Sequence, residues 1–191
     1  ARSESPEISY EEAKKHVIEA VAPLGEDYQE AMEEGLNSGW VDVFENKGKR
    51  SGAYSSSTYD SQPYILMNYQ DDVSSMYTLA HELGHSMHSY YSKKNQPYVY
   101  YGYGIFVAEV ASTVNEALLT RYLLKNAESS ELRKHALSHY LENFRNTLFR
   151  QTMFADFEQK VHESVENGEA LKSESLTKSY GEHKEKYHNH V

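Results

Sequence analysis

Residues Tyr77 to His88 read Tyr-Thr-Leu-Ala-His-Glu-Leu-Gly-His-Ser-Met-His, and the predicted fold is built around this stretch. Its histidines His81 and His85 are four residues apart, so a helix projects both imidazoles from one face, about one turn from each other. Glu82 follows His81 directly and lies beside that face. Two histidines and a glutamate in this order form the H-E-x-x-H pattern of helices that bind catalytic zinc.

The residues around this pattern predict a buried helix from Asp72 to Tyr91. The segment contains no proline, and its apolar residues recur at spacings of three and four. The residues of this stripe are Val73, Met76, Leu79, Ala80, Leu83 and Met87. Such a stripe is typical of a helix that packs in a core, which is a suitable place for metal-binding histidines.

A catalytic zinc site takes three protein ligands and keeps one position open, so a third ligand is required. His88 shares a face with the two histidines of the motif within about 60°, but three histidines of one straight helix cannot easily approach a single ion. A second amphipathic helix, expected from Ile105 to Lys125, carries Glu109 and Glu116 seven residues apart and therefore on one face. Either glutamate could reach the metal.

Several stretches spread over nearly the whole chain form a recognisable set with the motif. They are Trp40 to Val43, Lys47 to Tyr54, His81 to His88, Phe106 to Ser112 with Glu116, Phe144-Arg145 and Phe149 to Ala155. Together they resemble the oligoendopeptidase F branch of the thimet-oligopeptidase-like zinc peptidases. In that family the glutamate after Phe-Val-x is the third ligand of the single zinc ion, which implies Glu109 here. The resemblance then makes Glu116 a residue that orients a zinc-bound imidazole by accepting its other N–H.

The resemblance also implies a function and a larger enzyme. It implies a zinc endopeptidase that cuts short unfolded oligopeptides, in which Glu82 takes a proton from a zinc-activated water and passes it to the leaving amine. Family members are several hundred residues long, with further helical lobes on both sides of the zinc helix. Residues 1–191 are therefore interpreted as a single zinc-bearing catalytic domain, a fragment of such an enzyme. Apolar faces that the missing lobes would cover are expected to allow self-association.

The predicted fold class is mainly α, a zincin-like helical metallopeptidase domain with a small antiparallel β-sheet before the zinc helix. Ser9 and Glu12 form a capping box for a helix that ends near Val21, and a second helix is expected at 27–36. Aromatic, β-branched and Ser/Gly-rich residues with turn signals predict the sheet at 41–69. An edge of this sheet could pair with an extended substrate, or the sheet could simply pack on the zinc helix.

The longest helical pattern runs from about Ser130 to Asn167 and is predicted to bury a core-forming apolar stripe. The residues of this stripe are Leu132, Ala136, Tyr140, Phe144, Leu148, Phe154, Phe157, Val161 and Val165. From Ser173 onward the chain is hydrophilic. This tail is expected to fray.

Tyrosines crowd the connection between the two expected metal-bearing helices, with six of them from Tyr90 to Tyr103. Because this connection must pass near the zinc, the hydroxyl of Tyr101 or Tyr103 could donate to a peptide carbonyl of the substrate. Half-buried tyrosines that cover helix ends are the alternative. His88 is predicted to line the same cleft, with an ordinary surface histidine as its alternative.

Charge and composition exclude several classes of partner. The net charge of −10 argues against nucleic acid, because such binding needs a basic face that neutralises phosphates. The apolar stretches fall far short of the roughly 18 residues that a transmembrane helix needs. The absence of cysteine excludes disulfides and thiolate metal sites. The partner predicted is an oligopeptide substrate rather than nucleic acid or membrane, and the predicted location is cytoplasmic.

Three hypotheses of different classes follow. The leading one is the zinc peptidase with His81, His85 and Glu109 as ligands. The second is a domain that binds zinc or peptide without turnover, because the chain is short. The third is a carboxylate-bridged di-iron bundle, since Glu82 with His85 has an E-x-x-H counterpart in Glu185 with His188.

Overall fold

A computed structural model describes residues 6–188 and confirms the mainly helical fold class with a small sheet. The chain divides after Leu137 into two compact units, called here the N-terminal and C-terminal units. The N-terminal unit contains α1 (Tyr10–Ala20), the 3₁₀ turn η1 (Ala22–Leu24), α2 (Glu26–Asn37), β1 (Val41–Asp42), β2 (Tyr54–Ser56), β3 (Tyr64–Leu66), α3 (Val73–Asn95) and α4 (Ile105–Asn126). The division falls within α5 (Ser130–Asn143), and the C-terminal unit continues with the π-helical turn η2 (Phe144–Phe149), α6 (Arg150–Glu166) and α7 (Ser173–His188).

Local sequence signals explain where the first helices begin. The Ser9 hydroxyl accepts a hydrogen bond from the Glu12 backbone N–H at 3.3 Å, and the Glu12 carboxylate accepts one from the Ser9 N–H at 3.0 Å. The predicted capping box is therefore present at the start of α1. Asp72 caps α3 in a similar way by accepting from the Ser75 N–H at 2.7 Å. Satisfying these N–H groups fixes the residue at which each helix starts.

The sheet is mixed rather than wholly antiparallel, which corrects one detail of the sequence prediction. Its strand order is β1-β3-β2. The pair β2–β3 is antiparallel, as predicted, but β1 runs parallel to β3 with Val41 opposite Ile65. Parallel neighbours require a crossover connection, and here residues 43–63, which include β2, provide it. Strands of two and three residues are too short for an alternation of apolar and polar residues that would indicate how the strands pair in the sheet.

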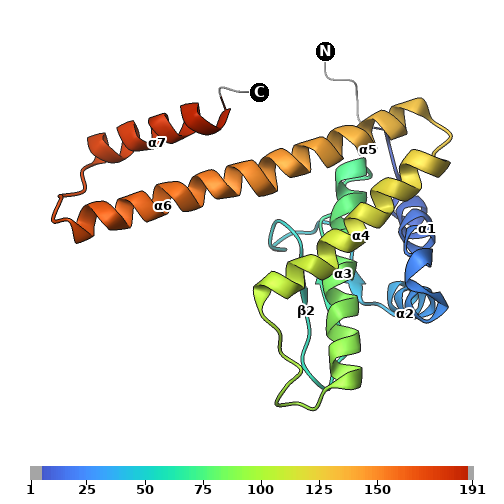
Figure 1. Cartoon of the computed structure of the whole chain (residues 1–191). Coiled ribbons are helices and arrows are strands. Elements are labelled where there is room, and N and C mark those ends of the chain that lie inside the picture. The colour runs from blue at the N-terminus through green and yellow to red at the C-terminus, as the bar shows by residue number, and fades with distance from the viewer. Residues whose placement is uncertain (1–5, 189–191) are drawn as a thin grey trace. The chain divides into compact units, whose positions relative to one another are not determined.

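The core of the N-terminal unit is built around α3. Figure 1 shows α4 crossing α3, with α1 and α2 on one side of α3 and β2 on the other. The whole predicted stripe of α3 is buried, from Val73 to Met87. The sheet adds the buried side chains of Ile65 and Met67, and α4 adds Leu119 and Leu123. Burial of this many apolar side chains holds α3 as a rigid scaffold.

The C-terminal unit differs from its prediction in two ways. Residues Ser173–His188 form the helix α7 instead of fraying, because α7 packs against α6 and Lys186 pairs with the Asp156 carboxylate. The last three residues of the predicted tail lie outside the described residues. Most of the stripe predicted to be core is only partly buried or is exposed, for example at Leu148 and Val165, which are 54% and 53% exposed. Only Leu132 and Ala136 of that stripe are fully buried, and both lie in the N-terminal unit.

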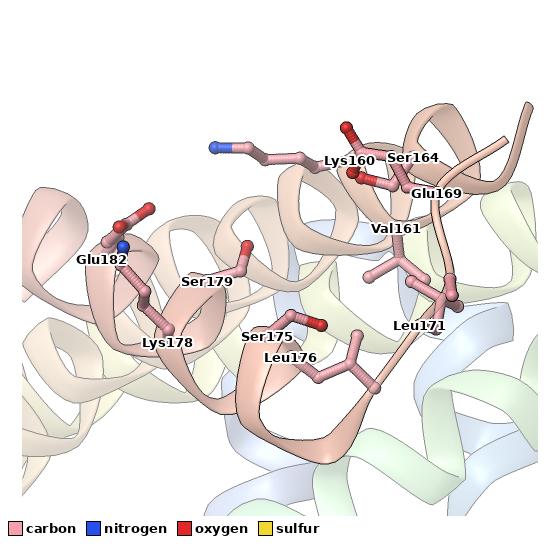
Figure 2. A pocket seen from close by; sticks show the side chains of 11 residues that line it. Lys160, Val161, Ser164, Glu169, Leu171, Ser175, Leu176, Lys178, Ser179 and Glu182 are labelled. Carbon is pink, nitrogen blue, oxygen red and sulfur yellow. The ribbon is translucent and has the colours of Figure 1, made fainter. Parts of the chain in front are cut away.

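A few apolar side chains lie at the turn between α6 and α7. Val161, Leu171 and Leu176 line a pocket of about 270 Å³ at this turn, together with charged residues such as Lys178 and Glu182 (Figure 2). None of the helices in the described part of the chain is both long and apolar enough to cross a membrane.

Candidate metal centre

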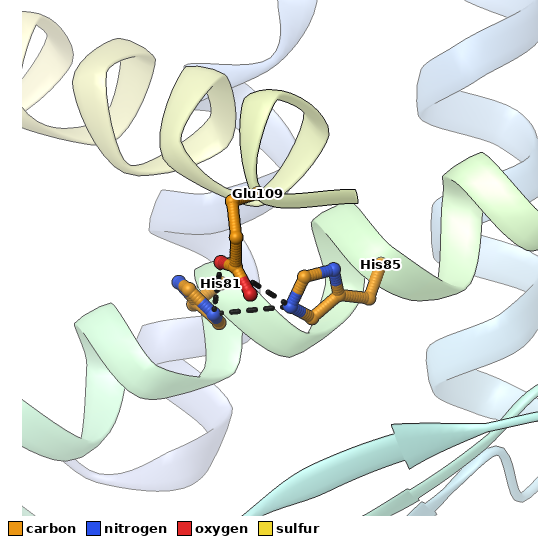
Figure 3. A group of neighbouring side chains, drawn as sticks. All are labelled: His81, His85 and Glu109. Atoms are coloured by element: carbon orange, nitrogen blue, oxygen red, sulfur yellow. Dashed lines mark hydrogen bonds and ion pairs between the residues drawn. The ribbon is translucent and has the colours of Figure 1, made fainter. Parts of the chain in front are cut away.

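Two helices bring the three predicted ligands together (Figure 3). Helix α3 supplies His81 and His85, and α4 supplies Glu109. The two histidine Nε2 atoms are 3.1 Å apart, and the Glu109 Oε2 lies 3.5 Å from that of His81 and 3.8 Å from that of His85. Ligand atoms held tetrahedrally about 2.0–2.2 Å from one zinc ion are roughly 3.3–3.6 Å apart. The three observed separations lie inside this range or within about 0.2 Å of it, so the donor atoms and their spacing fit a zinc ion.

Glu116 occupies the place predicted for a residue that orients an imidazole. Its Oε1 lies 2.6 Å from the Nδ1 of His81. An Nδ1–H that donates to this carboxylate leaves the Nε2 lone pair of His81 free to face the cluster. Burial opposes a charge on His81, but the hydrogen bond and charge of Glu116, with Glu82 and Glu109, raise its pKa above the ordinary value.

Glu82 lies next to the cluster but is not part of it. Its side chain is buried within the N-terminal unit, and this burial raises its pKa above the ordinary value. The nearby charge of Glu109 acts in the same direction, whereas His81 and a backbone hydrogen bond from Ser55 act against it. A carboxylate whose pKa is moved toward neutrality is a better proton acceptor for catalysis at neutral pH.

The pKa of His85 responds differently from that of His81. Burial lowers it, and the neighbouring His81 lowers it further, while Glu109 acts in the opposite direction. A lowered pKa keeps the imidazole of His85 neutral, and the neutral form is the one that binds metal. The Glu109 side chain is 48% exposed, so the cluster is open to solvent on the side of α4.

The tyrosine-rich connection runs alongside α3 close to the cluster. The ring of Tyr103 stacks on His88, with centroids 3.7 Å apart, and its hydroxyl lies 2.5 Å from the Ser89 hydroxyl. The Tyr101 carbonyl accepts a hydrogen bond from the Ser92 hydroxyl at 2.5 Å. These contacts hold the connection against α3, and a role of His88, Tyr101 and Tyr103 in substrate binding stays a prediction.

The sequence analysis does not identify the serines that lie near Glu82 and Glu109, because serine belongs to no metal-binding motif in this sequence. The Ser112 hydroxyl lies 3.0 Å from the Glu109 Oε2 and donates to it. The hydroxyls of Ser55 and Ser86 lie 2.8 Å apart and join β2 to α3 one turn beyond Glu82. The E-x-x-S spacing of Glu109 and Ser112 was the available signal, since residues three apart meet on a helix.

The di-iron hypothesis finds no support in the structure. Among residues 6–188, only His81, His85 and Glu109 form a group of three or more potential ligands. Glu185 and His188 lie on α7 in the C-terminal unit and join no such group within the described residues.

Comparison with known proteins places this architecture in a family. The sequence pattern of Peptidase family M3 matches residues 3–191. Oligopeptidase PepF of Bacillus subtilis (strain 168) is 56% identical over 180 residues, which cover 94% of this chain and 27% of that protein. An Oligoendopeptidase F homolog of Lactococcus lactis subsp. lactis is 48% identical over 182 residues, which cover 95% and 30%. A crystal structure from Chlamydophila abortus matches with a TM-score of 0.83 at 42% identity, covering 99% of this chain and 32% of its own.

The helical fold and these relatives place the chain in a family of peptidases. It belongs to peptidase family M3. The resemblance inferred from the sequence is thereby confirmed. The chain spans less than a third of the length of the relatives named above.

Proposed function

We propose that this chain carries the catalytic centre of a zinc-dependent oligopeptidase. His81, His85 and Glu109 would hold one zinc ion, and Glu116 would fix the orientation of His81. The observation that carries the proposal is the position of these three ligand atoms, all within 4.8 Å of one another, beside the buried Glu82. A zinc ion held there would supply Lewis-acid chemistry that polarises a peptide carbonyl and lowers the pKa of water.

Glu82 has the position and the environment of a general base. It follows His81 on α3, so its carboxylate lies beside the ligands and is free to accept a proton from the attacking water. After the attack, the protonated carboxyl group can donate that proton to the nitrogen of the leaving amine. The backbone hydrogen bond from Ser55 limits the positions that the carboxylate can take.

The substrates proposed are short unfolded oligopeptides. The names of the relatives, an oligopeptidase and an oligoendopeptidase F homolog, support this class. The strand β2 is an edge of the sheet and contacts α3 near Glu82. An extended peptide could add to such an edge through main-chain hydrogen bonds, which are tolerant of side-chain identity. The cytoplasmic location and the lack of nucleic-acid partners stay predictions.

Replacing Glu82 with Gln separates zinc binding from chemistry. The variant is expected to keep one zinc ion per chain, because Glu82 is not a ligand. It should lose on the order of 10²- to 10⁴-fold in the rate of peptide cleavage, because it lacks the proton acceptor. Zinc is measured by elemental analysis, and cleavage is followed with a short fluorogenic peptide. Glu158→Gln, an exposed residue of α6, is the matched control. Loss of zinc from Glu82→Gln would make Glu82 a ligand and refute the mechanism.

A domain that binds zinc or peptide without turnover is the second candidate. The observation that favours it is that the chain spans only 27% and 30% of two relatives. Groups that stabilise the transition state can lie in the remaining sequence, and loss of one such donor typically costs 10²- to 10³-fold in rate. Stoichiometric zinc with no detectable cleavage in the unaltered chain would favour this candidate. Cleavage that is lost in Glu82→Gln would exclude it.

A further inference from the structure

The two helices of the metal cluster come unusually close together at Gly84. A Cβ atom at this position would lie 2.6 Å from the Cα of Ser112 and 2.8 Å from the backbone oxygen of Ala111. Both of these are backbone atoms of α4, so no side chain can rotate away to make room. Gly84 lies between His81 and His85 on α3. The close approach of the α4 backbone therefore occurs on the same turn of α3 that carries the two histidines.

The residue that touches Gly84 also holds the third ligand. Ser112 is completely buried. Its hydroxyl lies 3.0 Å from the backbone oxygen of Glu109 and also 3.0 Å from the carboxylate Oε2 of Glu109, to which it can donate. This is the same oxygen that faces His81 at 3.5 Å and His85 at 3.8 Å. A continuous path of contacts thus runs from Gly84 through Ser112 to the Glu109 carboxylate.

We propose that Gly84 and Ser112 are positioning residues for the third metal ligand: the missing side chain of Gly84 sets the separation of the helices, and Ser112 aims the Glu109 carboxylate at the two histidines. This inference rests on the proposed zinc site and goes beyond its ligands. A methyl group at Gly84 requires the contact to open from 2.6 Å to 3.0 Å or more, and to 3.4 Å for ordinary packing, which is a shift of about 0.4–0.8 Å. Metal–ligand distances tolerate only about 0.2 Å, so a shift of this size displaces Glu109 from a competent position.

Two other glycines of the same chain provide matched controls. Gly35 lies in α2, where a Cβ would meet the ring of Trp40 at 2.5 Å, far along the sequence from the cluster. Gly181 lies in α7, where a Cβ would meet nothing within 4 Å. The first control reports a steric clash in the same unit without a link to Glu109. The second reports the effect of an added methyl group on a helix alone.

The test measures zinc affinity of the 191-residue chain by competition with a chromophoric chelator, together with the visible spectrum of Co²⁺ bound in its place. Gly84→Ala and Ser112→Ala are each expected to weaken zinc binding on the order of 10- to 100-fold and to alter the Co²⁺ spectrum. Gly35→Ala should lower the midpoint temperature of thermal unfolding, but the folded variant should keep the zinc affinity and the Co²⁺ spectrum of the parent chain. Gly181→Ala should leave zinc affinity unchanged.

A double-mutant cycle with Glu109→Ala assigns the effect to the third ligand. Once Glu109 is absent, Gly84→Ala and Ser112→Ala should change zinc affinity by no more than about twofold. If both lose as much affinity in that background as in the parent, or if folded Gly84→Ala binds zinc normally, the inference is overturned. If Gly84→Ala does not fold, Ser112→Ala decides alone by the same criteria. Unchanged affinity in Glu109→Ala itself would instead refute the proposed zinc site and the inference with it.

Discussion

Helices α3 and α6 carry apolar stripes of the same kind in the sequence but have different surroundings in the structure. Ten of the 23 residues of α3 are buried, whereas Met153 is the only fully buried residue among the 17 of α6. Helix α3 is enclosed by α1, α2, α4 and the sheet, while α6 packs on α7 within its own unit. Apolar periodicity therefore identifies the face that a helix can bury, but it does not say what covers that face.

The largest expected difference is in the free energy of unfolding, when one leucine is truncated in α3 and one in η2, the turn that leads into α6. Leu79→Ala in the core of α3 is expected to lower the free energy of unfolding by about 2–5 kcal/mol, because Leu79 is completely buried and its loss leaves a cavity. Leu148→Ala in η2 removes the same atoms from a side chain that is 54% exposed, and should change stability by no more than about 0.5 kcal/mol. Urea denaturation followed by circular dichroism measures both. Equal effects would mean that Leu148 is covered in solution.

The sequence predicts features that depend on local helix geometry better than features that depend on distant partners. The helix that carries the two histidines and the helix that follows it could both be predicted, because helix geometry places side chains three and four residues apart on one face. That geometry left Glu109 and Glu116 as alternatives, and only the resemblance to the oligoendopeptidase F branch implied Glu109. The close approach of α4 to Gly84 could not be predicted, since it depends on the angle and distance at which α4 crosses α3. The parallel pairing of β1 and the helix α7 were also missed, because both depend on partners distant in the sequence.

Self-association would cover the apolar face that the C-terminal unit exposes. Leu141, Phe144 and Phe149 line a pocket of about 330 Å³ within this unit, and each is about half exposed. If a second copy covers this face, Phe144→Ser should weaken association by up to roughly tenfold. Full burial of an aromatic side chain contributes about 1.5–3 kcal/mol, and only the half of Phe144 that is still exposed would be newly buried. Sedimentation velocity over a concentration series measures the effect, with the exposed Glu166→Ser as control. A chain that stays monomeric at every concentration would contradict this explanation.

The smallest expected effect concerns the polar contacts that hold α7 on α6. The Asp156 Oδ2 accepts hydrogen bonds from the Lys186 ammonium at 2.7 Å and from the Tyr187 hydroxyl at 3.1 Å. The hydrogen bond from Lys186, followed by that from Tyr187, lowers the pKa of Asp156 below its ordinary value. Because the folded state then binds the proton more weakly than the unfolded state, this contact stabilises α7 above the unfolded pKa. The stabilisation is lost as the pH falls through the lower, folded pKa.

Protection of the α7 backbone amides against hydrogen exchange should therefore decrease as the pH falls below about 4, the ordinary pKa of aspartate. Any change in the protection of α3 over the same range must come from groups other than Asp156. Asp156→Asn is expected to show weaker protection of α7 already at neutral pH and no further loss from this carboxyl group on acidification. Hydrogen exchange measured by mass spectrometry at several pH values resolves the two helices separately. Because Lys186 is exposed at its contact with Asp156, solvent screens the ion pair and the change should be small and reduced further by salt. If wild type and Asp156→Asn lose protection of α7 in parallel, apolar contacts at the turn, such as those of Leu171 and Leu176, must hold this helix instead.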